Sequence, residues 1–119
     1  MKSLGDTYEQ RAAAWLEERG FRLLQRNVRA RTGEIDLVAV DGECLVFVEV
    51  RARRDPRYES AAGSVDRRKQ RRLVQTARWF LQRNPRLAKR PCRFDVVAFE
   101  PPKSGPELTI RWIRGAFTA

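Results

Sequence analysis

The dipeptide Asp41-Gly42 separates two segments, 34–40 and 43–51, that are rich in β-branched and other apolar residues. Asp-Gly is favoured in two-residue hairpin turns, because both turn positions can require a positive φ. The sequence therefore predicts a β-hairpin with Asp41-Gly42 as its turn. In that register Asp36 faces Phe47, and Glu34 faces Glu49.

Side chains alternate across a strand, so this hairpin places Glu34, Asp36, Glu49 and Arg51 on one face. Carboxylates crowded on one face repel each other, and a divalent cation between Asp36 and Glu49 would relieve the repulsion. Oxygen ligands suit Mg²⁺ or Mn²⁺, which can polarise a phosphodiester and activate water. The alternative is a solvent-facing strand whose carboxylates pair with nearby arginines. The opposite face is predicted to be apolar and to carry Ile35, Leu37, Val46, Val48 and Val50.

The other segments predict helices and strands intermixed along the chain. Apolar residues three and four apart predict a helix over 6–19, which Gly20 ends, and another over 66–83, which Asn84-Pro85 ends. This mixture predicts one domain of the α/β class, with a mixed sheet flanked by helices. Further strands are expected over 21–27, 93–100 and 108–113, and loops over 52–63 and 101–107.

The charge of the chain indicates a polyanionic partner. Lys and Arg number 25 against 15 Asp and Glu, which gives a net charge of +10. Such a charge attracts nucleic-acid phosphates, but it would also attract acidic membranes or keep the protein in solution. No apolar run reaches the roughly 20 residues of a spanning helix, so we expect a cytoplasmic protein with no membrane partner.

The chain contains no histidine, which narrows the possible chemistry. Ser-His-Asp triads, Cys-His pairs and His-ligated zinc are excluded, so carboxylates, arginines and lysines must carry any catalysis. Cys44 and Cys92 each lie in an apolar run and match neither a disulfide framework nor a zinc-ligand pattern. We expect both to be buried reduced thiols.

The segments GEIDL at 33–37 and VFVEVRAR at 46–53 resemble the PD-(D/E)xK nuclease signature, in which an acidic residue precedes a strand bearing acid-x-Lys. Over nearly its whole length the chain resembles the YraN family of small bacterial proteins. That family is similar in fold to archaeal Holliday-junction resolvases and restriction endonucleases. The resemblance implies a restriction-endonuclease-like domain that hydrolyses DNA, including branched or structured DNA. The further residues that carry it are Gly5 with Glu9, Arg26-Asn27, Lys69, RFDVV at 93–97 and Ala116-Phe117.

Carried over by position, the resemblance implies that Asp36, Glu49 and the Val50 carbonyl bind Mg²⁺ or Mn²⁺. It also implies that Glu9 is an acid borne on a helix at the edge of the site. Asp6-x-x-Glu9 equally fits a capping box, in which Glu9 caps the first helical turn. Arg51 stands where the signature has lysine, and it can donate hydrogen bonds but cannot act as a base.

Basic residues on the second helix and on the loop before it are expected to bind nucleic-acid phosphates. Lys69 lies one turn before Leu73 on the apolar stripe, so its ammonium can reach the edge of the sheet. The alternative for Lys69 is a solvated surface position. The expected nucleic-acid-binding residues are Arg53, Arg54, Arg57, Tyr58, Arg67, Arg68, Lys69, Arg71 and Arg72.

Three functional hypotheses stay open from the sequence. The first is a metal-dependent DNA endonuclease, for which the resolvase resemblance is compatible with a homodimer. The second is a catalytically silent nucleic-acid-binding module of the same fold, which Arg51 favours. The third is a basic assembly protein, which accounts for the charge but not for the crowded carboxylates. Cleavage with Mn²⁺ separates the first two, and metal titration separates the third.

Overall fold

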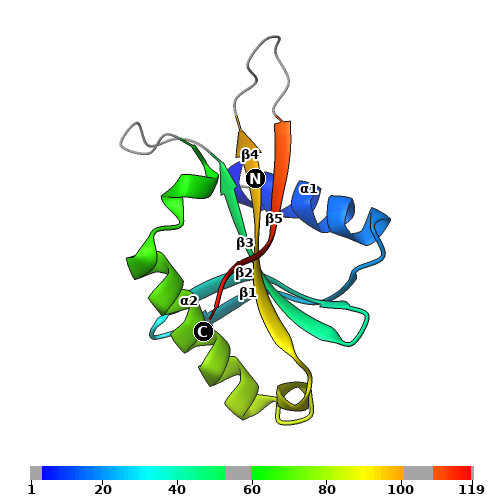
Figure 1. Cartoon of the computed structure of the whole chain (residues 1–119), viewed down its shortest axis with the longest axis vertical. Coiled ribbons are helices and arrows are strands. Elements are labelled where there is room, and N and C mark those ends of the chain that lie inside the picture. The colour runs from blue at the N-terminus through cyan, green and yellow to red at the C-terminus, as the bar shows by residue number, and fades with distance from the viewer. Residues whose placement is uncertain (1–3, 53–59, 101–108, 119) are drawn as a thin grey trace.

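The computed structural model describes residues 4–52, 60–100 and 109–118 (Figure 1). Most of the first predicted loop and all of the second fall in the gaps between these ranges. Arg53, Arg54, Arg57 and Tyr58 therefore lie outside the described residues. The end of the first loop is described and forms a short 3₁₀ turn, η1 (Ala62–Ser64).

Five strands of the described chain form one mixed sheet in the order β1-β2-β3-β4-β5. Neighbouring strands are antiparallel except β3 and β4, which are parallel. A parallel pair needs a crossover, which α2 (Arg67–Arg83) and the short η2 (Leu87–Lys89) provide. This is the predicted α/β class, with the mixed sheet and flanking helices of restriction-endonuclease-like architecture. The strands are β1 Arg22–Ala30, β2 Gly33–Asp41, β3 Cys44–Ala52, β4 Cys92–Glu100 and β5 Thr109–Phe117.

The two helices cover opposite faces of the sheet (Figure 1). Helix α1 (Leu4–Glu18) buries Ala12 and Leu16 against one face. Helix α2 buries Leu73 and Phe80 against the other, as its apolar stripe predicts. No helix in the described ranges is long and apolar enough to cross a membrane.

The β2–β3 hairpin is confirmed, but the predicted turn and register are wrong. Asp41 pairs with Cys44, so Gly42 and Glu43 form the turn, and Val38 rather than Asp36 faces Phe47. Gly42 has a φ of 61° at the first turn position, where a type II′ turn places glycine. Asp41 stays in the strand, where its carboxylate accepts a 2.8 Å hydrogen bond from Arg93 Nη2. The error is two residues, so most side chains keep their predicted face.

The prediction that Ile35 shares a face with Leu37 is also wrong. Ile35 packs in the core beneath α2, whereas Leu37 packs in the core beneath α1 with Val46 and Val48. Simple alternation would put residues two apart on the same face. β2 therefore departs from regular alternation at Asp36, the residue between them.

Element ends follow the predicted signals with small shifts. Gly20 ends α1 with a φ of 91°, and Asp66 caps α2 by accepting a hydrogen bond from Lys69 N over 2.9 Å. The last strand was predicted to end at 113 but runs to Phe117. Its pairing with β4 shifts register opposite Asp95, and Gly115, with a positive φ, lies in this irregular part of the strand.

The two cysteines are free thiols, but the expectation that both are buried is wrong. Cys44 is partly buried and Cys92 is exposed. Each is the first residue of its strand, β3 or β4, so it lies at the rim of the sheet and outside the apolar centre.

Candidate functional site

Strands β2 and β3 part at one end of the sheet. Their register ends at the pair Leu37 and Val48, and Asp36 and Glu49 follow directly beyond it. There the main-chain N–H of Val50 donates to Oδ2 of Asp36 over 2.8 Å. Here the Val50 N–H is bonded to the side chain of Asp36 instead of to the main chain of β2. This hydrogen bond holds the Asp36 carboxylate beside β3.

Glu49 is only 4% exposed, although it is a carboxylate. Its Oε1 lies 3.6 Å from Lys69 Nζ and 3.6 Å from Arg51 Nη1. Its Oε2 is buried and has no hydrogen-bond partner among the described residues. An unpartnered buried carboxylate oxygen costs free energy, so this atom is suited to a ligand that can accept its lone pairs.

Both carboxylates have raised pKa values. Burial, the largest cause, and the neighbouring Asp36 together raise the pKa of Glu49 to about 8, against the opposing effect of Lys69 and Arg51. Burial also raises the pKa of Asp36, although the Val50 N–H stabilises its charged form. Each group is therefore held near a competing negative charge in a site of low polarity. A divalent cation would relieve both effects.

A second group of acidic side chains meets at Asp36. One carboxylate oxygen from each of Glu9, Glu34 and Asp36 lies within 4.8 Å of the others. Glu9 also stabilises the charged form of Asp36 and so acts to lower its pKa, against the effect of burial. Helix α1 begins at Leu4, so Glu9 lies in its second turn and is not the residue of a capping box. The capping alternative for Glu9 is therefore wrong.

Asn27 of β1 joins two members of this acidic group. With its amide oriented to satisfy both neighbours, Asn27 Nδ2 donates to Glu34 Oε1 over 2.8 Å and to Glu9 Oε2 over 3.0 Å. Asn27 has a φ of 53°, the only positive φ among the described non-glycine residues. Asparagine tolerates this left-handed region better than most residues do. The motif Arg26-Asn27 contained this residue, but spacing along one strand gave no indication of its contacts.

Two cations reach Glu49 from different elements. Lys69 extends from the first turn of α2 to Glu49 of β3, and its side chain is only 30% exposed. The alternative of a solvated Lys69 is therefore wrong. Arg51 Nε donates to Ser64 Oγ of η1 over 2.8 Å, and this contact fixes its guanidinium beside Glu49.

The residues present fit a divalent cation. Asp36 and Glu49 supply anionic oxygen, one oxygen of Glu49 is buried without a partner, and no nitrogen or sulfur ligand is needed for Mg²⁺ or Mn²⁺.

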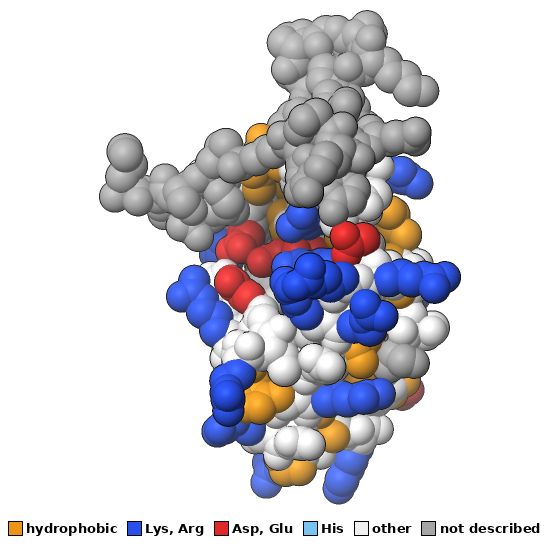
Figure 2. Space-filling model, turned by 90° about the vertical axis from the view of Figure 1, so that its left-hand side faces the viewer, with side chains coloured by type: hydrophobic (Ala, Val, Ile, Leu, Met, Phe, Trp, Pro, Cys, Tyr) orange, Lys and Arg blue, Asp and Glu red, His pale blue; other side chains and the backbone are white. Residues whose placement is uncertain are grey.

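Four further residues predicted to bind nucleic acid, Arg67, Arg68, Arg71 and Arg72, are exposed on α2. Figure 2 shows acidic side chains gathered in one patch with Lys and Arg side chains around it.

Residues 8–99 match the profile of the uncharacterised protein family UPF0102. The chain belongs to the UPF0102 family, also known as the YraN family. It is 47% identical over 116 residues to a UPF0102 protein of Alcanivorax borkumensis, covering 98% of this chain and 92% of the relative. It is 49% identical over 116 residues to one of Stutzerimonas stutzeri, covering 98% and 95%. A third, of Xanthomonas oryzae pv. oryzae, is 51% identical over 115 residues, covering 97% and 91%.

The UPF0102 match includes the residues that form the site. Glu9, Asn27, Glu34, Asp36, Glu49, Arg51 and Lys69 all fall within residues 8–99. The resemblance to the YraN family is thereby confirmed. The description of the family names no activity.

Proposed function

We propose that this chain is a metal-dependent endonuclease that hydrolyses phosphodiester bonds of DNA, including branched or structured DNA. The observation that carries the proposal is the buried Oε2 of Glu49, which has no partner among the described residues and lies beside Asp36. A phosphate-seeking net charge of +10 supports the same conclusion.

Asp36 and Glu49 would hold Mg²⁺ or Mn²⁺, and the Val50 carbonyl is the third proposed ligand. When bound, the cation would polarise the phosphodiester and lower the pKa of a coordinated water. Val50 N–H orients Asp36, and its 2.8 Å hydrogen bond leaves the other carboxylate oxygen of Asp36 free of that contact.

Lys69 and Arg51 supply positive charge next to the proposed scissile phosphate. Both contact Oε1 of Glu49, so each would lie close to a phosphate oxygen that shares the cation with Glu49. Negative charge that builds up on the phosphate during attack is stabilised by such fixed donors. Arg51 replaces the signature lysine as a donor, and Lys69 supplies the only ammonium that contacts Glu49 within the described residues.

Glu9 is proposed to act on the cation through Asp36. One of its carboxylate oxygens lies within 4.8 Å of one of Asp36, and its Oε2 accepts a hydrogen bond from Asn27. Asn27 would therefore fix Glu9 and Glu34 at the edge of the site, where Glu34 can reach the cation through a water.

Cleavage of a panel of linear, flapped, single-stranded and four-way DNAs with Mg²⁺ or Mn²⁺ tests the proposal. The Asp36→Asn protein, purified in parallel, reports any contaminating nuclease. We expect metal-dependent cutting by the wild-type protein and none by Asp36→Asn. Equal cutting by both proteins would refute the proposal.

A silent nucleic-acid-binding module is the second candidate, because Arg51 stands where the signature has lysine. It predicts tight binding to the same panel without cutting in either metal. RNA substrates of the same sequences distinguish DNA from RNA as the partner. Sedimentation with and without a four-way junction tests the homodimer.

A further inference from the structure

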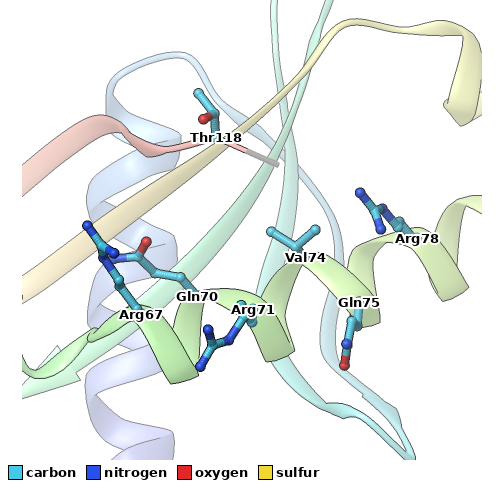
Figure 3. A pocket seen from close by; sticks show the side chains of 7 residues that line it. All are labelled: Arg67, Gln70, Arg71, Val74, Gln75, Arg78 and Thr118. Carbon is cyan, nitrogen blue, oxygen red and sulfur yellow. The ribbon is translucent and has the colours of Figure 1, made fainter.

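A hollow of about 450 Å³ lies along the exposed side of α2 (Figure 3). Three arginines of the helix line it, Arg67, Arg71 and Arg78, together with Gln70 and Gln75. Val74 lies between them, and Thr118, just after β5, closes the side opposite the helix. Among the described residues no acidic side chain contributes to the lining, so the three arginines make the hollow positively charged.

These arginines form one row on the helix. Positions 67, 71 and 78 fall on nearly the same side, because an α-helix turns by about 100° per residue. Arg68 and Arg72 form a second row, turned by about 100° from the first. The second row faces the β1–β2 turn, since a Cβ at Gly33 would lie 3.7 Å from the Cβ of Arg72.

The arginines of the hollow have no carboxylate partner within the part of the chain that the structure describes. Among the described residues, none of the three forms an ion pair, whereas Arg51, Arg93 and Arg111 each do. Like charges spaced four apart on a helix, as Arg67 and Arg71 are, destabilise it. The row therefore carries a cost in the free protein that an anionic ligand would offset. Guanidinium groups pair well with phosphate oxygens, and glutamine amides donate to the same atoms.

We propose that this hollow binds the phosphate backbone of one strand of duplex DNA, while Arg68 and Arg72 contact the other strand. The inference deepens the proposed function and rests on it for the class of ligand. The exposed part of α2 would lie in the major groove, which is about 12 Å wide and admits a helix of roughly 10 Å diameter. A rise of about 1.5 Å per residue places Arg78 about 16 Å along the helix from Arg67, so the row is long enough to contact more than one phosphate of a strand.

The geometry predicts which nucleic acids use the hollow. A duplex presents two strands on either side of α2, so it contacts both rows. A single strand led to Asp36 and Glu49 needs only the second row, which is Arg68 and Arg72, and not the hollow. Duplex RNA has a major groove too deep and narrow for a helix, so it would not seat α2 in this way.

The test compares two variants with the same change in net charge. Arg71→Gln/Arg78→Gln removes two charges from the hollow, and Arg19→Gln/Arg22→Gln removes two charges at the α1–β1 connection, across the sheet from α2 (Figure 1). Binding of duplex DNA, single-stranded DNA and duplex RNA is measured by fluorescence anisotropy over a range of salt. EDTA is present throughout, so that cleavage plays no part, and thermal melting checks that each variant is folded.

We expect Arg71→Gln/Arg78→Gln to weaken duplex DNA binding at least tenfold and to reduce its salt slope by about 1.8, or about 0.9 for each lost phosphate contact. Single-stranded DNA and duplex RNA should be bound within about threefold of wild type. The control variant should keep the wild-type slope. Equal weakening by both variants, equal weakening for all three ligands, or no binding of nucleic acid by the wild-type protein would overturn the proposal. Failure of the proposed function would appear separately, as an absence of cleavage with duplex binding intact.

Discussion

Lys69 Nζ lies 3.6 Å from Oε1 of Glu49, so an ammonium from α2 reaches a buried carboxylate of β3. The same oxygen lies 3.6 Å from Arg51 Nη1, but Arg51 is also tied to Ser64 through Nε. The two cations therefore differ in their attachments. Among the described residues, Glu49 is the one side chain that Lys69 Nζ contacts, whereas Arg51 is also anchored to the turn before α2.

This difference leads to the first prediction. Lys69→Gln should lower the cleavage rate about 100-fold, because removal of one donor to a developing negative charge typically costs that much. Arg51→Lys keeps a cation but loses the Ser64 contact, and it should change the rate by about tenfold or less. Rates are measured at saturating Mg²⁺. A larger loss in Arg51→Lys than in Lys69→Gln would assign the main cationic role to Arg51.

Asp36→Asn and Glu49→Gln are expected to abolish cleavage while leaving duplex binding in EDTA similar or tighter. Each substitution removes a proposed metal ligand, and each also removes negative charge that repels phosphate. Calorimetric titration with Mn²⁺ should show binding to wild type and at least tenfold weaker binding to either variant. Loss of DNA binding together with cleavage would indicate misfolding instead.

The raised pKa of Glu49 makes metal-free stability depend on pH. The pKa is about 8 in the folded chain and lower in the unfolded chain, so between these values the folded state holds the extra proton. Stability in EDTA should therefore fall as the pH rises from about 5 to about 8, by on the order of a few kcal/mol. Glu49→Gln should show a flatter profile in thermal melts. Mn²⁺ affinity should rise over the same range, because binding must displace that proton.

Asn27 allows its amide and its backbone to be tested separately. Asn27→Gly keeps the positive φ without strain but loses both hydrogen bonds to Glu9 and Glu34. Asn27→Ala loses the same hydrogen bonds and adds strain of about 1–2 kcal/mol. Both variants should weaken Mn²⁺ binding and cleavage about equally. Only Asn27→Ala should also lower the free energy of unfolding, measured with urea, by the amount of that strain. If Asn27→Gly cleaves at the wild-type rate, the Asn27 amide has no role in the site.

Asp95 provides a contrast, since its contacts are structural. Its Oδ1 accepts from Arg93 Nε and Gly115 N over 3.0 and 2.9 Å, and its Oδ2 accepts from Trp112 Nε1 over 2.9 Å. Asp95→Ala should destabilise the fold by about 3–5 kcal/mol, because it leaves these buried donors without their acceptor and leaves Arg93 with Asp41 as its remaining partner. Mn²⁺ affinity of the folded fraction should stay unchanged, which distinguishes this loss from that of Asp36→Asn.

The sequence alone determined the elements and the faces of most of their residues. Alternation fixed the face of Glu49 and Arg51, and a register error of two residues did not change it, because the period of a strand is two. The apolar stripe of α2 and the end of α1 at Gly20 were also predicted from neighbouring residues. These features depend on hydrogen bonds and side-chain spacing within a few residues, which a single segment of sequence contains.

Only the tertiary structure decided which distant residues meet. Glu9 from α1, Asn27 from β1 and Lys69 from α2 converge on the carboxylates of β2 and β3 through helix packing and the parting of two strands. Asp41, which ends β2 at the hairpin turn, is likewise held by Arg93 of β4. Such contacts join residues far apart in the chain, and their energies depend on burial and on the packing of whole elements. Local patterns carry no information about these energies, so the site was complete only once the sheet and both helices were in place.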